Sequence, residues 1–394
     1  MADYKITVND EILHGFSSNP SALSELVSDV LSQILDSQAT EQVGVEPYGR
    51  DEGRTNYRNG VRSRELMSRI GPLKLQVPQL RVGGAVKTEL FAHYQRSELA
   101  FVSALMEMVI NGVSTRKVTR ITEELCGGSF SKSTVSDLCK NLDPKIDAWR
   151  NRPLGEYPFV LVDAIVTKVR LDGRVRPQSV LVALGINPQG YREILGFYVG
   201  DSESERTWGE FFSSLVARGL TGVELVVSDQ HKGLVKAIET HFQGTSWQRC
   251  QTHFMRNITD AAPKSLSPEI RDRVRSIFQA PDVETARLLL ERTLAQYTAK
   301  APNAMKCLEN GFDDAVAVLA LPSAYRKRLR TTNTVERLNE EIRRRERVIR
   351  IFPNVASVER LVGAVLLEND EEQAARKYLE MEEYESWKKT KSKS

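Results

Sequence analysis

Apolar residues recur along the chain with different periods, and each change of period marks a new segment. Between residues 21 and 43 they recur at helical spacing, which predicts an amphipathic helix. Asn19 and Pro20 precede it as a cap and a favoured first helical residue. We therefore assign residues 1–45 to an N-terminal helix. It packs either on its own domain or on a second copy of the chain, as a dimer contact.

Residues 46–100 are polar, basic and rich in glycine. The stretch 48–60 has the composition of a loop, and residues 64–81 contain two short strand-like runs joined at Gly71-Pro72. These patterns predict a basic loop and hairpin that contact DNA, with a solvated charged surface as the alternative. The candidate DNA contacts in this segment are Arg58, Arg62 and Arg81.

Residues 101–152 return to helical spacing and divide into three helices. The first ends near Asn111-Gly112, the second ends at Cys126-Gly127-Gly128, and Ser131 caps the third. A short glycine turn followed by a helix that starts with small polar and basic residues fits helix-turn-helix geometry. Helical hairpins also occur for other reasons, so a purely structural role stays open. The candidate base-reading residues are Lys132, Ser133 and Thr134.

From Tyr157 the pattern becomes that of β-strands. Three strand-like runs come first, and alternating helices and strands follow, which predicts a mixed α/β sheet over residues 153–260. The expected strands are 158–170, 176–186, 192–199, 223–229 and 246–250, and the expected helices are 207–219, 233–242 and one from Thr252.

The last third of the chain is helical by its spacing. Residues 261–325 show no strand pattern and are expected to be a helical insertion into the sheet domain. The core resumes over residues 326–360 with a helix that carries Glu336. One further helix, from Ala356, is expected to run into a basic tail, so residues 361–394 are assigned to a C-terminal helix and tail.

Composition adds bounds on size and charge. The chain has 394 residues, of which 41% are hydrophobic and 27% are charged, and its net charge is only +3. This length exceeds the usual limit of one hydrophobic core and predicts roughly two to four domains. Arginines are concentrated in residues 50–81 and 326–350. Such local basic patches indicate a nucleic-acid partner more strongly than the small net charge does.

The same composition argues against secretion and membrane insertion. No apolar run approaches the roughly 20 residues of a membrane span, and the polar N-terminus is not a signal peptide. The cysteines do not form a disulfide framework, which suits a reducing compartment. We expect a soluble, cytoplasmic protein without a membrane partner. The cysteines are Cys126, Cys139, Cys250 and Cys307.

Three carboxylates are candidates for phosphoryl-transfer chemistry. Glu336 lies at the start of a helix that then fills with arginine, and Asp163 and Asp229 each end an apolar run typical of a buried strand. Carboxylates suit Mg²⁺, and two such ions about 4 Å apart activate the nucleophile and stabilise the leaving oxygen. Asp163, Asp229 and Glu336 are therefore the candidate catalytic and metal-binding residues, for two ions of Mg²⁺ or Mn²⁺.

This order of acids is that of a ribonuclease-H-like catalytic core. The expected fold is thus an α/β mixed-sheet core of that type with an all-helical insertion, preceded by a mainly helical N-terminal DNA-binding region. Each acid also has a simpler explanation. Asp163 could be a polar strand end, Asp229 a helix cap, and Glu336 the acid of a capping box that starts at Asn333. Glu340 and Glu341 compete with Glu336 for the catalytic role.

Several polar residues near these acids are candidates for supporting roles. Cys250 and His253 form a Cys-x-x-His pair, but a zinc site at sensible spacing lacks further ligands even if His241 is included. We therefore favour Cys250, His253 and Asn333 as active-site support. Trp208 is expected in the core. The arginines of the Glu336 helix would repel one another unless they face phosphates, so the candidate DNA contacts are Arg337, Arg343, Arg344 and Arg345.

Eight ordered, separated strings of residues strengthen this interpretation. They are Tyr57-Arg-Asn-Gly, Val77-Pro-Gln-Leu-Arg81, Val162-Asp163-Ala, Glu205-Arg-Thr-Trp208 before Ala217-Arg-Gly-Leu220, Ser228-Asp229-Gln-His-Lys-Gly-Leu234, Trp247-Gln-Arg-Cys250-Gln-Thr-His253-Phe-Met-Arg-Asn257 and Thr331-Thr-Asn-Thr-Val-Glu336-Arg-Leu-Asn339. Through them the chain resembles the bacterial Mutator-type insertion-sequence transposases over most of its length. The resemblance implies that Asp163, Asp229 and Glu336 bind the catalytic metal ions of a DDE transposase.

The expected function is therefore a DNA transposase that binds the terminal inverted repeats of an insertion sequence and catalyses metal-dependent strand cleavage and strand transfer. The expected partners are double-stranded DNA, both terminal repeats and target, and a second copy of the chain; no small-molecule substrate is expected. The resemblance also implies a dimer on paired ends and, for many bacterial members, a circular intermediate. The alternatives are a metal-dependent nuclease on the same core and a catalytically inert DNA-binding regulator.

Overall fold

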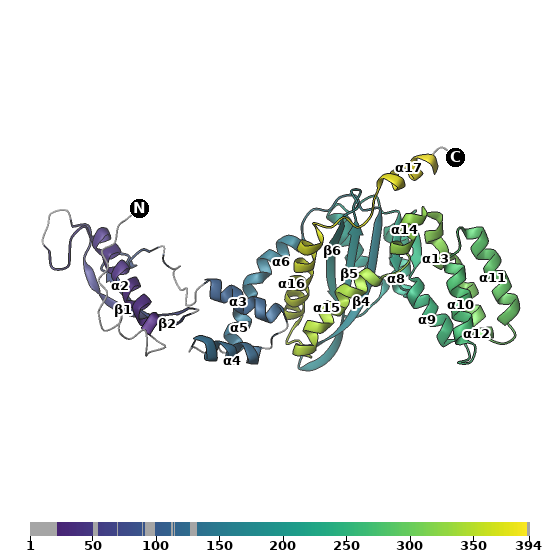
Figure 1. The fold of residues 1–394 in the computed structure, drawn as a ribbon. Helices are drawn as coiled ribbons and strands as arrows, with labels where there is room; N and C mark the ends of the chain where they lie inside the picture. The colour runs from purple at the N-terminus through teal and green to yellow at the C-terminus, as the bar shows by residue number, and fades with distance from the viewer. Residues whose placement is uncertain are drawn as a thin grey trace. The chain divides into compact units, whose positions relative to one another are not determined.

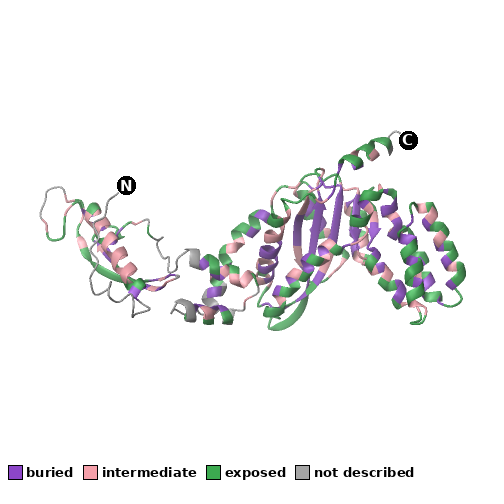
Figure 2. Cartoon of the chain, viewed as in Figure 1, coloured by how far each residue is buried: buried purple, intermediate pink, exposed green. Residues whose placement is uncertain are grey.

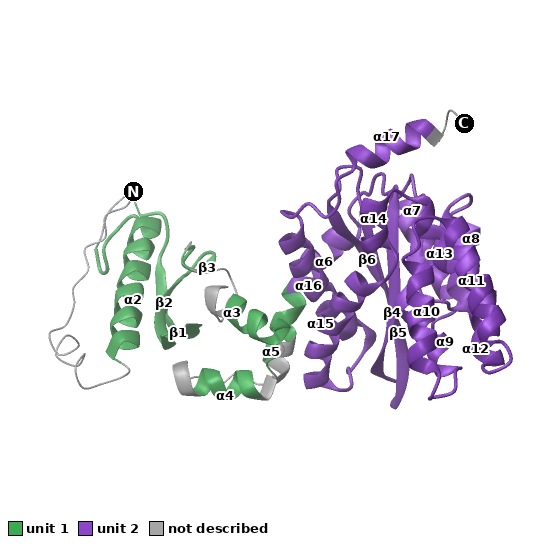
Figure 3. Cartoon of the chain, turned by 45° about the vertical axis from the view of Figure 1, so that its right-hand side comes forward, with its two compact units in different colours: residues 1–141 green, residues 142–394 purple. Residues whose placement is uncertain are grey.

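The computed structural model divides the chain into two units. It describes residues 22–49, 54–68, 70–88, 90, 99–111, 113, 115–126 and 132–391. Unit 1 comprises Met1–Asn141 and unit 2 comprises Leu142–Ser394, and Figure 3 colours them separately. Each unit has its own buried apolar clusters.

Unit 1 begins with a helix beside a small antiparallel sheet. Helix α2 (Ala22–Val43) matches the predicted first helix, whereas Asn19, Pro20 and Ser21 lie outside the described residues. In the described part of this unit, the sheet has the order β1 (Arg58–Ser68), β2 (Gly71–Leu80) and β3 (Gly84–Ala85).

Helix α2 packs on this sheet. Its buried Leu35 belongs to one apolar cluster with Leu75 of β2. The hydroxyl groups of Ser28 and Ser32 accept hydrogen bonds from backbone N–H groups of Lys74 and Gln76, each at 3.1 Å. The helix therefore packs on its own domain, and a contact of the same helix with a second copy of the chain stays a prediction.

The hairpin differs from the prediction in its bounds. Strand β1 starts at Arg58, so residues 58–60 are strand and not loop. The reversal lies between Ser68 and Gly71, which pair with each other, and Pro72 pairs with Met67 inside the ladder. The turn was predicted at Gly71-Pro72, and this position is wrong. Both residues belong to the paired strand β2, so the turn lies just before Gly71.

Three helices with a small common core complete unit 1. They are α3 (Leu99–Ile110), α4 (Thr115–Cys126) and α5 (Lys132–Cys139), and each contributes one residue to a buried cluster of Leu105, Val118 and Val135. The third helix ends earlier than predicted. Gly112 and residues 127–131, which include the predicted glycine turn and the cap Ser131, lie outside the described residues.

The end of the predicted 101–152 segment belongs to unit 2. After a 3₁₀ turn (Lys140–Leu142), helix α6 (Asp143–Arg150) starts anew, with a proline in its first turn. The Trp149 indole N–H donates to Asp370 at 2.8 Å, and Arg360 donates to both carboxylate oxygens of Asp143. These partners lie in helix α16 (Val355–Gln373), so α6 is fixed to unit 2. The boundary near residue 152 is corrected to residue 141.

Unit 2 is built on a mixed sheet covered on both faces (Figure 1). Within residues 142–391, the five strands have the order β6-β5-β4-β7-β8. Strands β4, β5 and β6 form an antiparallel meander, and β7 and β8 are parallel to β4. The bounds are β4 Phe159–Leu171, β5 Arg174–Ile186, β6 Arg192–Gly200, β7 Leu225–Ser228 and β8 Ser246–Arg249.

Strand β4 is central, and its side chains alternate between two cores. Leu161 and Ile165 belong to the cluster that includes residues of α15 (Asn333–Ile349) and α16, whereas Val160 and Val162 face α7 (Glu205–Ala217) and α8 (Lys232–His241). This burial on both faces explains the nearly continuous apolar run in the sequence, and Figure 2 shows the buried sheet between its helices. Trp208 is fully buried in the second cluster, as expected.

Residues 251–329 are helical and have a third core in unit 2. The helices are α9 (Gln251–Asp260), α10 (Ser267–Phe278), α11 (Val283–Tyr297), α12 (Pro302–Asn310), α13 (Phe312–Val316) and α14 (Ser323–Leu329), with a 3₁₀ turn at Ala317–Ala320. The prediction that residues 264–321 contain no strand is confirmed. Nowhere in the described ranges is a helix both long and apolar enough to cross a membrane.

The C-terminal helix is interrupted, contrary to the prediction. Helix α16 ends at Gln373, and the backbone N–H groups of Tyr378 and Leu379 then bond to the Gly190 carbonyl at 2.8 and 3.0 Å. Gly190 has φ +87°, and a Cβ there would lie 1.8 Å from the Leu379 carbonyl oxygen. The close approach of this segment to the β5–β6 turn therefore needs glycine.

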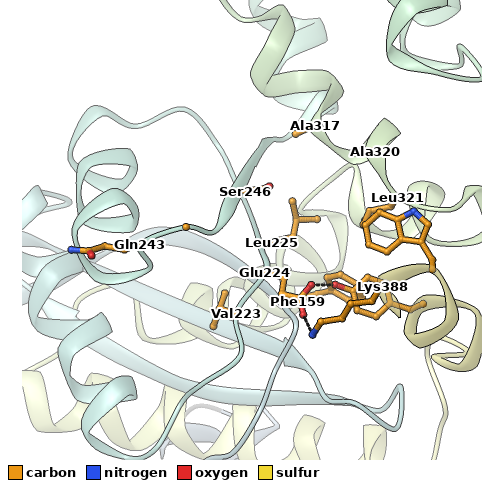
Figure 4. Close-up of a pocket in the computed structure, with 13 residues that line it drawn as sticks. Phe159, Val223, Glu224, Leu225, Gln243, Ser246, Ala317, Ala320, Leu321 and Lys388 are labelled. Carbon is orange, nitrogen blue, oxygen red and sulfur yellow. Dashed lines mark hydrogen bonds and ion pairs between the residues drawn. The ribbon is translucent and has the colours of Figure 1, made fainter. Parts of the chain in front are cut away.

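Helix α17 (Glu382–Lys391) then lies across the starting ends of the parallel strands. The hydroxyl of buried Tyr384 and the ammonium of Lys388 both contact Glu224, and the Tyr384 ring packs edge-on against Phe159. Beside them is a cavity of about 450 Å³ (Figure 4). It lies at the ends of β4 and β7 that are opposite to the candidate acids.

Candidate active site

The first two candidate acids come from adjacent parallel strands. Leu161 of β4 pairs with Val227 of β7, and continuing that register by two residues places Asp229 level with Asp163. Asp163 lies on the same side of β4 as Leu161, because alternate strand residues share a face. The predicted strand 158–170 is confirmed as β4, whereas the alternative that Asp163 is a polar strand end is wrong. Asp163 lies inside β4, which continues to Leu171 in pairing with β5 after β7 has ended.

Helix α15 brings the third acid to the same place. The Asn339 amide donates to the Asp163 carboxylate at 2.9 Å, and further along the helix Glu346 accepts a hydrogen bond from Thr167 of β4 at 2.6 Å. After the helix, the backbone N–H of Phe352 donates to Lys168 of β4 at 2.8 Å. The helix is therefore fixed along β4. Glu336 lies one turn before Asn339 on the same side of the helix.

His253 connects the second and third acids. Its Nδ1 atom lies 3.9 Å from a carboxylate oxygen of Asp229 and 3.8 Å from Oε1 of Glu336. It belongs to the first turn of α9, directly after β8. Since β8 is parallel to β7, the segments that follow the two strands meet at one edge of the sheet. The structure therefore gathers Asp163, Asp229, Glu336 and His253 at one place.

Cys250 fixes the start of the Glu336 helix. Its side chain is fully buried, and its backbone N–H donates to Ser228 at the end of β7 at 2.7 Å. The Thr332 backbone N–H lies 3.4 Å from the Cys250 sulfur. The Thr332 hydroxyl lies 3.3 Å from that sulfur and 2.9 Å from Oε1 of Glu336. This single hydroxyl proton can be donated to one of the two acceptors at a time.

The alternative roles of Asp229 and Glu336 as helix-capping residues do not match the structure. The cap of α8 is His231, while the Asp229 side chain accepts from the adjacent Gln230 N–H at 2.7 Å. Residue Asn333 is the first residue of α15 and is exposed, and Thr332 occupies the cap position. The capping-box explanation of Glu336 is thus wrong. The support predicted for Asn333 is not seen, because its exposed position leaves Thr332 as the neighbour of Glu336.

Burial and neighbouring charges shift three pKa values at this site. Burial raises the pKa of Asp163 to about 6, although hydrogen bonds from the Ala164 backbone and from Asn339 oppose the rise. Contact with the Cys250 sulfur, together with the charges of Asp229 and Glu336, raises the pKa of His253 to about 9. Burial raises the pKa of Cys250, but its contacts with His253 and Thr332 outweigh this and hold it below the usual value.

Comparisons with known proteins identify the family of the chain. The model of the Mutator family of transposases matches residues 5–375. The chain belongs to this family. It is 43% identical over 370 residues to the transposase for insertion sequence element IS256 in transposon Tn4001 of Staphylococcus aureus, covering 92% of this chain and 94% of that protein. It is 41% identical over 374 residues to the transposase for insertion sequence element ISRM5 of Rhizobium meliloti, covering 94% of each chain. It is also 40% identical over 368 residues to the transposase for insertion sequence element IS1081 of Mycobacterium tuberculosis, covering 93% of this chain and 89% of that protein.

A transposase acts on DNA, so the exposure of the predicted phosphate contacts matters. On α15, Arg337, Arg343 and Arg344 are exposed, and Arg344 pairs with Glu341 at 3.1 Å. Arg345 is different. Its side chain is only 5% exposed and pairs with both Glu341 and Glu368. The prediction that Arg345 faces DNA phosphates is therefore wrong, because this arginine holds α15 against α16.

The candidate DNA contacts in unit 1 of the transposase differ in their exposure and in their partners. Arg62 and Arg81 are exposed, and the Arg81 guanidinium lies 5.6 Å from the centre of the Tyr57 ring. The Arg58 guanidinium instead contacts Asp36 and Thr40 of α2, which gives it a role in packing the sheet on the helix. The side chains of Lys132, Ser133 and Thr134 lie outside the described residues, so base reading by them stays a prediction.

Two residues of the transposase site were not identified from the sequence. Thr332 and Asn339 lie on either side of Glu336, at spacings that place all three on one side of α15. Both are polar yet buried: Thr332 is fully buried and Asn339 is 4% exposed. A polar residue at an apolar position of an amphipathic helix is the signal that could have found Asn339.

Proposed function

We propose that this transposase cleaves DNA at the ends of an insertion sequence and transfers the freed strand, with Asp163, Asp229 and Glu336 as its catalytic carboxylates. The observation that supports this most directly is their convergence. Acids separated by at least 66 positions in the sequence, on β4, directly after β7 and on α15, come to one edge of the sheet. The same site also holds His253, which faces two of the three acids.

The proposed core type is ribonuclease-H-like. In support, a three-strand antiparallel meander is continued by two strands parallel to its first strand, in the order β6-β5-β4-β7-β8. The first acid is on the central strand, the second directly follows the next parallel strand, and the third is on a late helix laid along the central strand. This placement of acids supports a core of that type.

The residues of the site fit divalent metal ions. Asp163, Asp229 and Glu336 offer carboxylate oxygens, which Mg²⁺ and Mn²⁺ prefer as ligands. The raised pKa of Asp163 shows a carboxylate that is buried without enough positive charge beside it. Among the described residues, the side-chain oxygen of Asn339 is also buried there without a hydrogen-bond partner. When bound, two such ions supply an activated nucleophile and a stabilised leaving oxygen.

The neighbouring residues position these carboxylates. Asn339 holds one oxygen of Asp163 by donating to it. Thr332 holds Oε1 of Glu336, and the buried sulfur of Cys250 holds Thr332 in turn. Side chains fixed in this way lose little additional freedom when a ligand binds, which favours accurate placement of the DNA phosphate.

The proposed partners are terminal inverted repeats, target DNA and a second copy of the chain. The test is direct. The full-length protein is incubated with a duplex that carries an end of its element and with Mg²⁺, and nicked and joined products are measured. Both products are expected, and both should be lost in EDTA. Nicking without joining would indicate a nuclease on this core, and neither product would indicate an inert DNA-binding regulator.

Replacing Thr332 with Val should lower the cleavage rate by roughly 10–100-fold, the usual effect of losing a residue that orients a metal ligand. Valine keeps the volume but cannot donate to Glu336. The measurement is single-turnover cleavage at saturating DNA, with thermal unfolding measured alongside. Thr332→Ser should restore most of the rate. Thr334→Val is the matched control, because that hydroxyl contacts Tyr378 instead; an equal loss in the control would remove the special role of Thr332.

Arg343 and Arg345 should behave oppositely when replaced with Ala. Exposed Arg343 is expected to contact a phosphate, so its loss should weaken binding to all sequences and lower the salt slope by about one unit. Buried Arg345 pairs with Glu341 and Glu368, so its loss should lower the unfolding temperature and leave the slope unchanged. The measurement is DNA affinity against salt concentration. An unchanged slope and affinity for Arg343→Ala would leave this arginine as a solvated side chain.

A further inference from the structure

One set of side chains at this site has a different ligand chemistry from the three acids. Cys250, His253 and Glu336 each offer one ligand atom, and these atoms all lie within 4.8 Å of one another. Within the part of the chain that the structure describes, no other group of three cysteine, histidine or acidic side chains comes so close. The group was not recognisable as a ligand set in the sequence, because Glu336 follows the Cys-x-x-His pair by 83 positions.

The local packing leaves these atoms facing one another. The Cys250 side chain is fully buried. Nδ1 of His253 is also buried and, among the described residues, makes no hydrogen bond of regular geometry, although Glu336 lies only 3.8 Å away. The Thr332 backbone N–H points at the Cys250 sulfur from 3.4 Å, as expected beside a metal-binding thiolate. Three possible ligand atoms of different chemistry therefore lie close together at one point of the site.

A sulfur, a nitrogen and an oxygen ligand together do not suit Mg²⁺, which prefers oxygen alone. They suit a thiophilic ion, since Zn²⁺ binds cysteine sulfur, histidine nitrogen and carboxylate oxygen with tetrahedral geometry. Zinc sites with three protein ligands keep a fourth position open for water or substrate. The observed separations are somewhat larger than those in a closed tetrahedron, so small side-chain movements would complete the site.

We propose that Cys250, His253 and Glu336 form a binding site for a thiophilic divalent cation of the Zn²⁺ class. The site shares Glu336 with the three catalytic acids. It therefore draws this carboxylate away from Mg²⁺, and a cation bound there inhibits strand cleavage. The binding itself does not depend on the catalytic role of the acids; only the inhibitory consequence rests on the proposed function.

The binding test uses Co²⁺ as a spectroscopic substitute for Zn²⁺ in the full-length, chelator-treated protein. We expect one ion to give a thiolate-to-cobalt charge-transfer band in the near ultraviolet together with tetrahedral visible bands, and excess Zn²⁺ to remove both. Ions at oxygen ligands alone give no thiolate band. Cys250→Ser should lose the band. Cys307→Ser, which changes a half-buried cysteine on α12, is the matched control and should keep it.

Two outcomes would overturn the site: no thiolate band in the wild-type protein, or a band that persists in Cys250→Ser. If circular dichroism shows that Cys250→Ser is unfolded, Glu336→Gln decides instead, because it keeps the thiol. It should weaken Co²⁺ binding by roughly tenfold or more, and unchanged affinity would exclude Glu336 as a ligand.

Cleavage assays then separate this inference from the proposed function. Zn²⁺ at concentrations that displace Co²⁺ should inhibit Mg²⁺-dependent nicking in the wild-type protein. Full nicking with the site saturated would contradict the shared role of Glu336. A complete absence of nicking with Mg²⁺ alone would count against the proposed function, while the cobalt band would still report whether the thiophilic site exists.

Discussion

Replacing Asp163 with Asn, Asp229 with Asn or Glu336 with Gln is expected to abolish strand cleavage while DNA binding changes little. Each substitution keeps the shape of the side chain and removes the negative charge that holds a divalent ion. Loss of several kcal/mol of transition-state stabilisation corresponds to roughly a thousandfold or more in rate. The measurements are the nicking rate of an end-containing duplex with Mg²⁺ and the affinity for the same duplex with Ca²⁺.

The matched control is Glu340→Gln. Glu340 is an exposed acid on the same helix, one turn after Glu336, and this substitution removes the same charge without touching the site. It should cleave at nearly the wild-type rate. Wild-type cleavage by any one of the three site variants would remove that residue from the catalytic set, and equal losses in Glu340→Gln would point to a general charge effect on α15.

Stability provides a check on misfolding for Asp163→Asn. Burial raises the folded-state pKa of Asp163 to about 6, from an ordinary value near 3.8. Ionising this carboxyl group therefore opposes folding, and the penalty grows as pH rises from about 4 through 6. Asparagine cannot ionise, so without divalent ions this variant should unfold at a higher temperature than wild type at neutral pH. An inactive but more stable protein would exclude unfolding as the cause.

The sequence predicts a strand or helix best where burial alone determines which residues it contains. The first half of strand β4 is buried on both faces, so it is an unbroken apolar run. In its second half buried and exposed residues alternate, and the predicted strand 158–170 included this half as well. The sequence does not contain the pairing with β5, which runs from Phe159 to Leu171 and places Asp163 inside the sheet.

Two features that differ from the prediction could have been predicted from the sequence. Val335, Leu338, Ile342 and Arg345 recur at helical spacing, and all four are buried, so the pattern of α15 itself places Arg345 on the packed side. Pro144 likewise marks the start of a new helix, since proline is favoured in the first turn. By contrast, the contact of Thr332 with Cys250 joins residues 82 positions apart and follows only from the fold.

Separating the two units is expected to separate DNA selection from chemistry. Residues 1–141 hold the small sheet, its helix and α3 to α5, but none of the three acids. Expressed alone, this fragment should prefer element-end DNA to unrelated duplex and show no cleavage. It should end at Asn141, because α6 is anchored in unit 2 by the bonds from Trp149 to Asp370 and from Arg360 to Asp143.

The physical reason is that phosphate contacts provide affinity, whereas sequence is read by side chains at base edges. Ser133 and Thr134 lie at the start of α5, where a recognition helix presents its base-reading residues. Replacing both with Ala in the full-length protein should lower the specific-to-nonspecific binding ratio by roughly 1–3 kcal/mol per lost base contact and leave nonspecific affinity unchanged. Residues 142–394, which keep the acids, should bind both DNAs equally. If the 1–141 fragment fails to discriminate while the full-length protein does, DNA selection belongs to unit 2, where the helices of residues 264–321 are the next region to test.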